Sequence, residues 1–195
     1  MKISVEKEYA NKMIFSVEGI STTLANAVRR YSMMHTNILA IDNITFYDNT
    51  TWVFDEYLAH RIGLMPIKTP EKLPEDFEVM FSLDETGPKI VYSKDLKSSD
   101  KEISMAKENI PILTLNQNQH LRLEGKAILG LGTKHAKFQA GLISYELLDE
   151  DKFNFRVESF YNMKPEEIII RGCNVLEKDL SELTKELKKA EKKKD

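Results

Sequence analysis

Residues 165–190 read PEEIIIRGCNVLEKDLSELTKELKKA, the most regular stretch of the sequence. Pro165 suits the first position of a helix, and the glutamates that follow it lie where the helix dipole favours acids. The pattern predicts a helix of about 28 residues, which is about 42 Å long at 1.5 Å per residue. A chain of 195 residues has little surface of its own to cover such a length.

The apolar residues of this helix recur in steps of four and three along one seam. The average spacing of 3.5 residues is typical of helices that pack along a heptad repeat. The seam can lie on the chain's own domain or meet another chain, and both can hold along different turns. Because the helix is long, we expect part of the seam to contact a second chain. The seam consists of Ile169, Cys173, Leu176, Leu180, Leu183, Leu187 and Ala190.

The rest of the chain predicts strands and shorter helices. From Phe77 onward, short strands over residues 77–83 and 121–129 enclose a polar stretch, residues 93–109. This pattern predicts a separate, loop-rich β unit inserted into the first domain. The other expected elements are a hairpin over 3–17, a helix from Ser21–Thr23 to Met34, a strand over 40–47, a helix from Asp55 to Ile62 that Gly63 stops, and strands over 142–147 and 153–157.

Composition excludes several classes of protein. Lys plus Arg total 28 and Asp plus Glu total 31, and the net charge of −3 disfavours a free-standing nucleic-acid-binding module. No apolar run approaches the roughly 18 residues of a membrane span, and the N-terminus lacks an apolar signal core, so we expect a cytoplasmic chain. The one cysteine, Cys173, excludes an internal disulfide and a four-cysteine zinc or iron–sulfur site, and we expect no cofactor.

No stretch carries a clear catalytic pattern. Asp55-Glu56 and His60-Arg61 could suggest acid–base chemistry, but acids at the start of a helix and cations at its end are ordinary dipole complementarity. The glycine-rich stretch 130–135 lacks the spacing of a phosphate-binding loop, and the four histidines lack metal-ligand spacing. Arg29 and Arg30 could form bidentate contacts with carboxylates or phosphates, or they could simply lie on a solvated face of the helix.

Four motifs resemble one known family. They are residues 18–30 (EGISTTLANAVRR), 39–49 (LAIDNITFYDN), 54–66 (FDEYLAHRIGLMP) and 130–138 (GLGTKHAKF). In this order they are similar to the D subunits of archaeal RNA polymerase, the counterparts of the third eukaryotic polymerase subunit and of the bacterial α N-terminal domain. The resemblance covers nearly the whole chain.

The resemblance implies an α+β fold and a role in transcription. A discontinuous dimerisation domain with an antiparallel sheet and long helices would span residues 1–47 and 142–195, and an inserted loop-rich β domain would span 48–141. The family member belongs to DNA-directed RNA polymerase, a nucleotidyltransferase complex, and has no catalytic residue of its own. Its partners are the polymerase subunits L, N and B: it forms a heterodimer with L and then recruits N and B, of which B is a large subunit. We expect no direct contact with nucleic acid or membrane.

Two sets of residues match interface positions of the family. The interface with L would be formed by Ile169, Cys173, Leu176, Leu180, Leu183 and Leu187. The interface with the large subunit would be formed by Asn26, Arg29, Arg30, Asp55, Glu56 and Arg61.

One departure from the family is clear. Many members carry a ferredoxin-like domain with cysteine clusters between the last two strands, where this chain has only Leu148–Lys152. The chain therefore resembles the short, cluster-free form. Two other functions stay open as alternatives: a free-standing nucleic-acid-binding module, and a small hydrolase or transferase that uses Glu56 and His60. A basic run, Lys192–Lys194, ends the C-terminal helix where cations are favoured.

Overall fold

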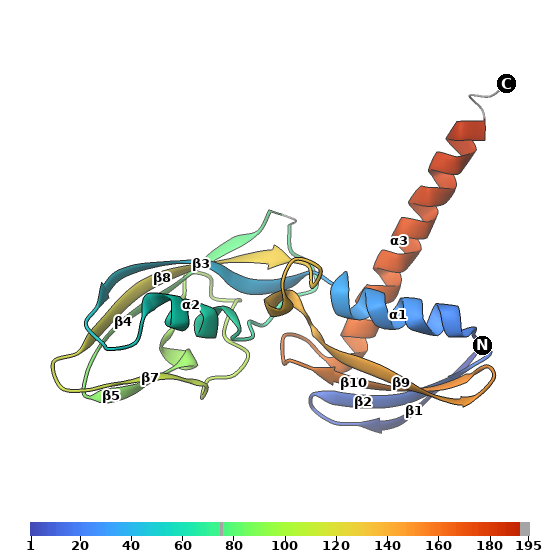
Figure 1. Cartoon of the computed structure of the whole chain (residues 1–195). Coiled ribbons are helices and arrows are strands. Elements are labelled where there is room, and N and C mark those ends of the chain that lie inside the picture. Colours follow the sequence, from blue (N-terminus) through green and yellow to red (C-terminus); the bar gives the residue numbers. More distant parts are fainter. Residues whose placement is uncertain (75, 192–195) are drawn as a thin grey trace. The chain divides into compact units, whose positions relative to one another are not determined.

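The computed structural model describes residues 1–74 and 76–191, and the basic run Lys192–Lys194 lies outside the described residues. Contacts divide the chain into two units, which can be followed by colour in Figure 1. Among the described residues, the first unit contains 1–36, 140–159 and 164–191, so it is built from the two ends of the sequence. The second contains residues 37–139 and 160–163. The fold is α+β with an inserted β-rich unit, as the sequence predicted.

The first unit is a four-stranded antiparallel sheet with two helices. Alternate residues of its two central strands are buried, as period-two patterning requires. The Phe15 and Phe155 rings face each other across these strands and stack with centroids 5.1 Å apart. The strand order is β1 (Lys2–Glu8), β2 (Lys12–Glu18), β10 (Lys152–Ser159) and β9 (Gly141–Asp149).

The helices α1 (Thr22–Met34) and α3 (Pro165–Glu191) pack on each other. Ser21 caps α1 because its Oγ accepts a hydrogen bond from the Leu24 N–H at 3.2 Å. Gly172 of α3 lies against Ser32 of α1, and a Cβ at Gly172 would clash with the backbone and hydroxyl of Ser32. The two backbones therefore approach closely, which only glycine allows at this position.

The second unit is built on an antiparallel sheet of long and short strands. Its core includes Leu39, Leu58, Ile62, Phe81 and Leu123, all nearly or fully buried. The helix α2 (Asp55–Gly63) packs on this core. In the main sheet the strand order is β3 (Ile38–Asn49), β8 (His120–Gly130), β4 (Glu78–Thr86) and β6 (Lys97–Ser98). A second sheet pairs β5 (Lys89–Tyr92) with β7 (Pro111–Leu115). The unit also contains two short 3₁₀ helices, η1 (Ser93–Asp95) and η2 (Ala136–Phe138).

The boundary between the units differs from the expected one. Residues 37–47, expected in the first domain, lie in the second unit because β3 pairs with β8 along its whole length. Residues 160–163 also return to the second unit. There the side-chain Nδ2 of Asn162 donates to the backbone carbonyl of Ile67 at 3.2 Å, and the backbone N–H of Thr69 donates to the backbone carbonyl of Asn162 at 2.9 Å. Hydrogen bonds between residues far apart in the sequence, which composition does not reveal, therefore accompany both boundaries.

Two local expectations change in detail. The polar stretch 93–109 supplies Leu96, Ile103 and Met105 to the core, so irregular backbone here still buries apolar side chains. The short helix ends at Gly63 as expected, but Gly63 has no positive φ. Glycine is instead favoured because a Cβ there would lie 3.3 Å from the Ile41 carbonyl oxygen.

Candidate subunit interfaces

One face of α3 packs against its own unit. Pro165, Ile168 and Gly172 are buried, and about two turns farther along the Tyr31 hydroxyl donates to Asp179 Oδ2 at 3.0 Å. This carboxylate raises the pKa of Tyr31, because it favours the protonated hydroxyl. Ile168 and Gly172 each precede a seam residue by one position, and neighbouring residues of a helix point about 100° apart. The inward face of α3 and the predicted seam are therefore different faces.

The seam changes its surroundings along the helix. Ile169 and Leu176 are half-buried, and Cys173 is exposed. Farther along, Leu180, Leu183 and Leu187 are 54%, 57% and 58% exposed. Every residue from 177 to 191 is exposed. The C-terminal half of α3 thus presents a row of leucines that the unit itself does not cover.

An apolar groove of about 490 Å³ continues the seam onto α1. Leu24 and Val28 of α1 line it together with Leu176 and Leu180 of α3, and Cys173 lies among them. Although Cys173 is exposed as a residue, its thiol is partly desolvated in this groove, which raises the pKa of the thiol and keeps the side chain neutral. Leu24 and Val28 were not predicted as interface residues, although their i, i+4 spacing was a signal that could have found them.

The two arginines of α1, Arg29 and Arg30, are neighbours in sequence but point in different directions from the helix. Asn26 Oδ1 accepts hydrogen bonds from Arg29 Nε at 3.2 Å and from Arg29 Nη2 at 2.9 Å. This pair fixes the Arg29 guanidinium beside its own helix. Arg30 is exposed, and it points about 100° away from Arg29. The structure therefore leaves Arg30 as the accessible cation of this helix.

In the second unit, α2 carries the other predicted interface residues. Asp55 and Glu56 lie in its first turn and His60 and Arg61 in its last, as dipole complementarity predicted. Asp55 Oδ1 accepts a hydrogen bond from Asn49 Nδ2 at 2.7 Å. Arg61 donates from Nε and Nη2 to the Pro111 carbonyl at 3.1 and 2.6 Å, so its guanidinium is already held within the unit.

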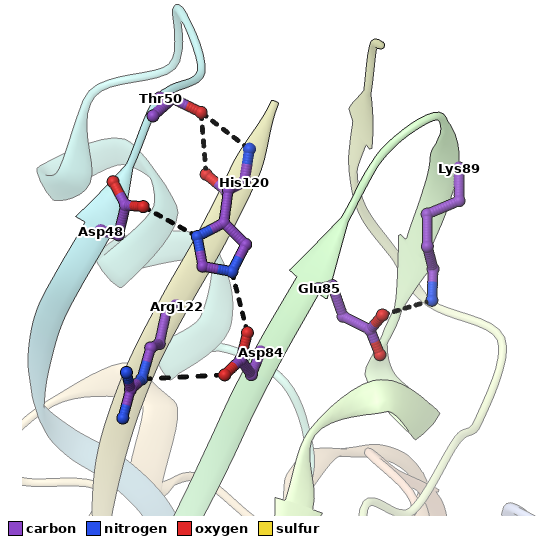
Figure 2. A network of polar contacts seen from close by, with 7 residues as sticks. All are labelled: Asp48, Thr50, Asp84, Glu85, Lys89, His120 and Arg122. Carbon is purple, nitrogen blue, oxygen red and sulfur yellow. Dashed lines mark hydrogen bonds and ion pairs between the residues drawn. The ribbon is translucent and has the colours of Figure 1, made fainter. Parts of the chain in front are cut away.

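A polar network at one end of the sheet was not predicted (Figure 2). His120 Nδ1 lies 2.8 Å from Asp48 Oδ2, and His120 Nε2 lies 2.8 Å from Asp84 Oδ1. Only the doubly protonated ring can donate to both carboxylates, and the hydrogen bonds to Asp48 and then to Asp84 raise the pKa of His120. The network ties together β3, β8 and β4. Sequence patterns could not reveal it because His120 is 72 and 36 residues away from its partners.

The glycine-rich stretch also has a structural role. Asp42 forms ion pairs with Lys134 at 3.3 Å and with Lys137 at 2.7 Å. Both lysines lower the pKa of Asp42, and Lys137 has the larger effect. Within residues 1–74 and 76–191, no group of three or more His, Cys, Asp or Glu residues could hold a metal ion. None of the helices in this part of the chain is both long and apolar enough to span a membrane.

Comparisons with known proteins match this architecture. Residues 39–151 match the family described as the RNA polymerase Rpb3/RpoA insert domain. The chain is 36% identical over 180 residues to DNA-directed RNA polymerase subunit Rpo3 of Methanocaldococcus jannaschii, with 92% of each chain covered. It is 39% identical over 153 residues to subunit Rpo3 of Pyrococcus horikoshii, where 75% of this chain but only 59% of the relative is covered. It is 42% identical over 128 residues to subunit Rpo3 of Halobacterium salinarum, and this match covers 66% of this chain and 52% of the relative.

The match over residues 39–151 places the chain in the class of RNA polymerase subunits that carry an Rpb3/RpoA insert domain. The chain belongs to that class, in the family of archaeal DNA-directed RNA polymerase subunit Rpo3. The strands β9 and β10 are separated only by residues 150 and 151, so no domain is inserted between them. Together with the 92% coverage of the Methanocaldococcus jannaschii relative, this agrees with a short form of the family.

Proposed function

We propose that the chain is a non-catalytic assembly platform of RNA polymerase, which forms a heterodimer with subunit L and then recruits subunit N and the large subunit. The observation that supports this proposal best is the uncovered leucine row of α3. Leu180, Leu183 and Leu187 are each more than half exposed and follow heptad spacing. Full burial of a leucine side chain is worth about 1.5–3 kcal/mol, so a partner helix would stabilise this row considerably.

Co-expression tests the contact with L. Alone, the chain is expected to self-associate or to be poorly soluble, because large apolar surfaces seek partners. Together with subunit L of the same organism, it is expected to elute as a 1:1 heterodimer whose mass light scattering can measure. A well-behaved monomer that does not bind L would contradict the proposal.

Arg30 tests the contact with the large subunit. We propose that the exposed Arg30 pairs with a carboxylate or backbone carbonyls of the large subunit, and removal of one partner of such a buried pair typically costs about 2–5 kcal/mol. Arg30→Glu should then leave the heterodimer with L intact and stop recruitment of the large subunit in stepwise reconstitution. Undiminished binding of the large subunit would show that Arg30 is an ordinary surface residue, and loss of the L heterodimer would show that the interfaces are assigned to the wrong faces.

We further propose that the protein works without an iron–sulfur cluster, because Cys173 is its one cysteine and a cluster needs about four such ligands. Protein purified without oxygen should be colourless and contain no stoichiometric iron. Iron and labile sulfide at about one cluster per chain would refute this part of the proposal.

A further inference from the structure

Three large aromatic side chains are exposed within six residues of the second unit. Trp52 and Phe54 are each 78% exposed, and Tyr57, in the first turns of α2, is 61% exposed. Val53, between the first two, is turned inward and packs against the core of the unit. Trp52 and Phe54 are therefore both left exposed, on either side of a residue that packs inward.

The loop that carries these aromatics is held rigidly. Asn49 Nδ2 donates to the Val53 carbonyl at 2.9 Å and to Asp55 Oδ1 at 2.7 Å, which spans the loop from end to end. Thr51 donates from its N–H and its hydroxyl to Asn49 Oδ1 at 3.1 and 2.7 Å, and its hydroxyl accepts from the Val53 N–H at 3.2 Å. The side chains of Asn49 and Thr51 thus fix the backbone on which Trp52 and Phe54 stand.

We propose that Trp52, Phe54 and Tyr57 anchor a protein–protein contact, and that the partner offers an apolar pocket bordered by lysine or arginine. Exposed tryptophan and tyrosine residues are the side chains most enriched among residues that dominate binding energy. A loop that is already ordered loses little conformational entropy when it binds. The combination of a rigid loop and uncovered aromatic rings fits an anchor better than an ordinary surface turn.

The charges beside the aromatics decide which partner fits. Asp55 and Glu56 follow Phe54 directly and are exposed. They favour a basic rim on the partner, and they oppose nucleic acid, whose bases could stack on the rings but whose phosphates would be repelled. They also oppose a second copy of this chain, because a two-fold contact would bring the same acids together.

This inference rests on the proposed function, in which Asp55 and Glu56 face the large subunit. It identifies Trp52, Phe54 and Tyr57, rather than the neighbouring charges, as the main source of affinity in that contact. Arg61 supports the geometry from the other end of α2, because its guanidinium is used to hold the Pro111 carbonyl.

The test measures the affinity of the preformed heterodimer with L for the large subunit of the same organism. The double variant Trp52→Ala with Phe54→Ala should bind the large subunit at least about 30-fold more weakly, as expected for loss of dominant anchors. Trp52→Phe, which keeps an aromatic ring, should retain most of the affinity. Ile90→Ala is the matched control, because Ile90 is an exposed apolar residue of β5 in the same unit, at 46% exposure, and should change nothing.

Charge reversal supplies a second, independent arm. Glu56→Lys should weaken binding of the large subunit and reduce its sensitivity to salt, because the attraction to a basic rim is lost. If the wild-type heterodimer binds the large subunit but the Trp52→Ala, Phe54→Ala variant binds equally well, the inference is wrong while the proposed function stands. If the wild-type heterodimer does not bind the large subunit, the proposed function fails and the inference fails with it. Loss of self-association in the double variant, with binding of the large subunit unchanged, would identify a second copy as the partner and also overturn the inference.

Discussion

The two halves of α3 carry the same kind of sequence but have different surroundings. From Pro165 to about Leu176 the helix packs on α1, and it buries Ile168 and Gly172 on its inward face. From Glu177 to Glu191 the helix continues with the same apolar spacing, but every residue is exposed. The first half therefore stabilises the fold of the chain itself, and the second half carries the exposed leucine row for which we propose a partner chain.

The difference teaches that a heptad pattern alone does not say what it packs against. In the first half, contact with Ser32 selects a face one residue away from the seam. In the second half Tyr31 of α1 still donates a hydrogen bond to Asp179, but Leu180, Leu183 and Leu187 of the seam stay more than half exposed. Substitutions in the two halves should consequently separate effects on folding from effects on assembly.

The largest effect is expected from Leu180→Glu combined with Leu183→Glu. In the heterodimer each leucine should contribute about 2–3 kcal/mol by burial, and burial of a charge adds a further penalty, so the heterodimer with L should not form. The fold of the chain should be unchanged, because both leucines are already exposed. Gel filtration with light scattering measures the first result, and far-UV circular dichroism measures the second.

Lys178→Ala and Lys185→Ala are the matched controls for this pair. Both lysines lie on the same half of α3, outside the seam, and are exposed. They should leave heterodimer formation nearly unchanged. If they impair it as strongly as the leucine substitutions, the C-terminal half of α3 has no preferred face and the heptad interpretation fails.

A smaller effect, on folding rather than on assembly, is expected from Ile168→Ala. Ile168 is fully buried, and truncation of a buried isoleucine to alanine typically costs about 2–5 kcal/mol of the free energy of unfolding. Denaturant titration of the dilute chain should show this loss. Once folded, the variant should still bind L. A variant that unfolds normally but cannot bind L would reverse the roles assigned to the two faces.

The smallest effect is expected from Cys173→Ser, at the junction between the halves. The thiol lines the groove between α1 and α3, and a hydroxyl there should cost about 1 kcal/mol in the heterodimer. Assembly should remain intact, with slightly faster dissociation from L. Complete loss of assembly would mean that Cys173 has a chemical role that packing does not explain.

The sequence predicted the long helix, its heptad seam and the inserted β unit, because each depends on regular spacing. It could not locate the inward face of α3. Ile168, Ile169 and Ile170 are three consecutive isoleucines that point in three directions, so hydrophobic periodicity permits more than one register. The close approach of Gly172 to Ser32, together with the burial of Ile168, marks the register that packs on α1.

Other features depended on contacts between residues far apart in the sequence. The strand β3 belongs to the second unit because it pairs with β8, some 80 residues later. His120 meets Asp48 and Asp84 only when three strands align (Figure 2). Because these hydrogen bonds raise the pKa of His120, the protonated ring stabilises the folded protein fully below pH 6.5, the usual pKa of histidine. This contribution to the free energy of unfolding declines as the pH rises through the folded-state pKa of His120. Trp52 and Phe54 lie beside or within the family motifs, but only the structure shows how exposed they are.

Hydrogen exchange along α3 tests the division of this helix most directly. Mass spectrometry would compare the dilute chain with its heterodimer with L, using peptides from residues 165–176 and 177–191. We expect the first peptides to be protected in both samples, and the second to exchange rapidly in the dilute chain and to become protected in the heterodimer. Equal exchange of residues 177–191 in both samples would contradict the claim that the leucine row is the surface that binds L.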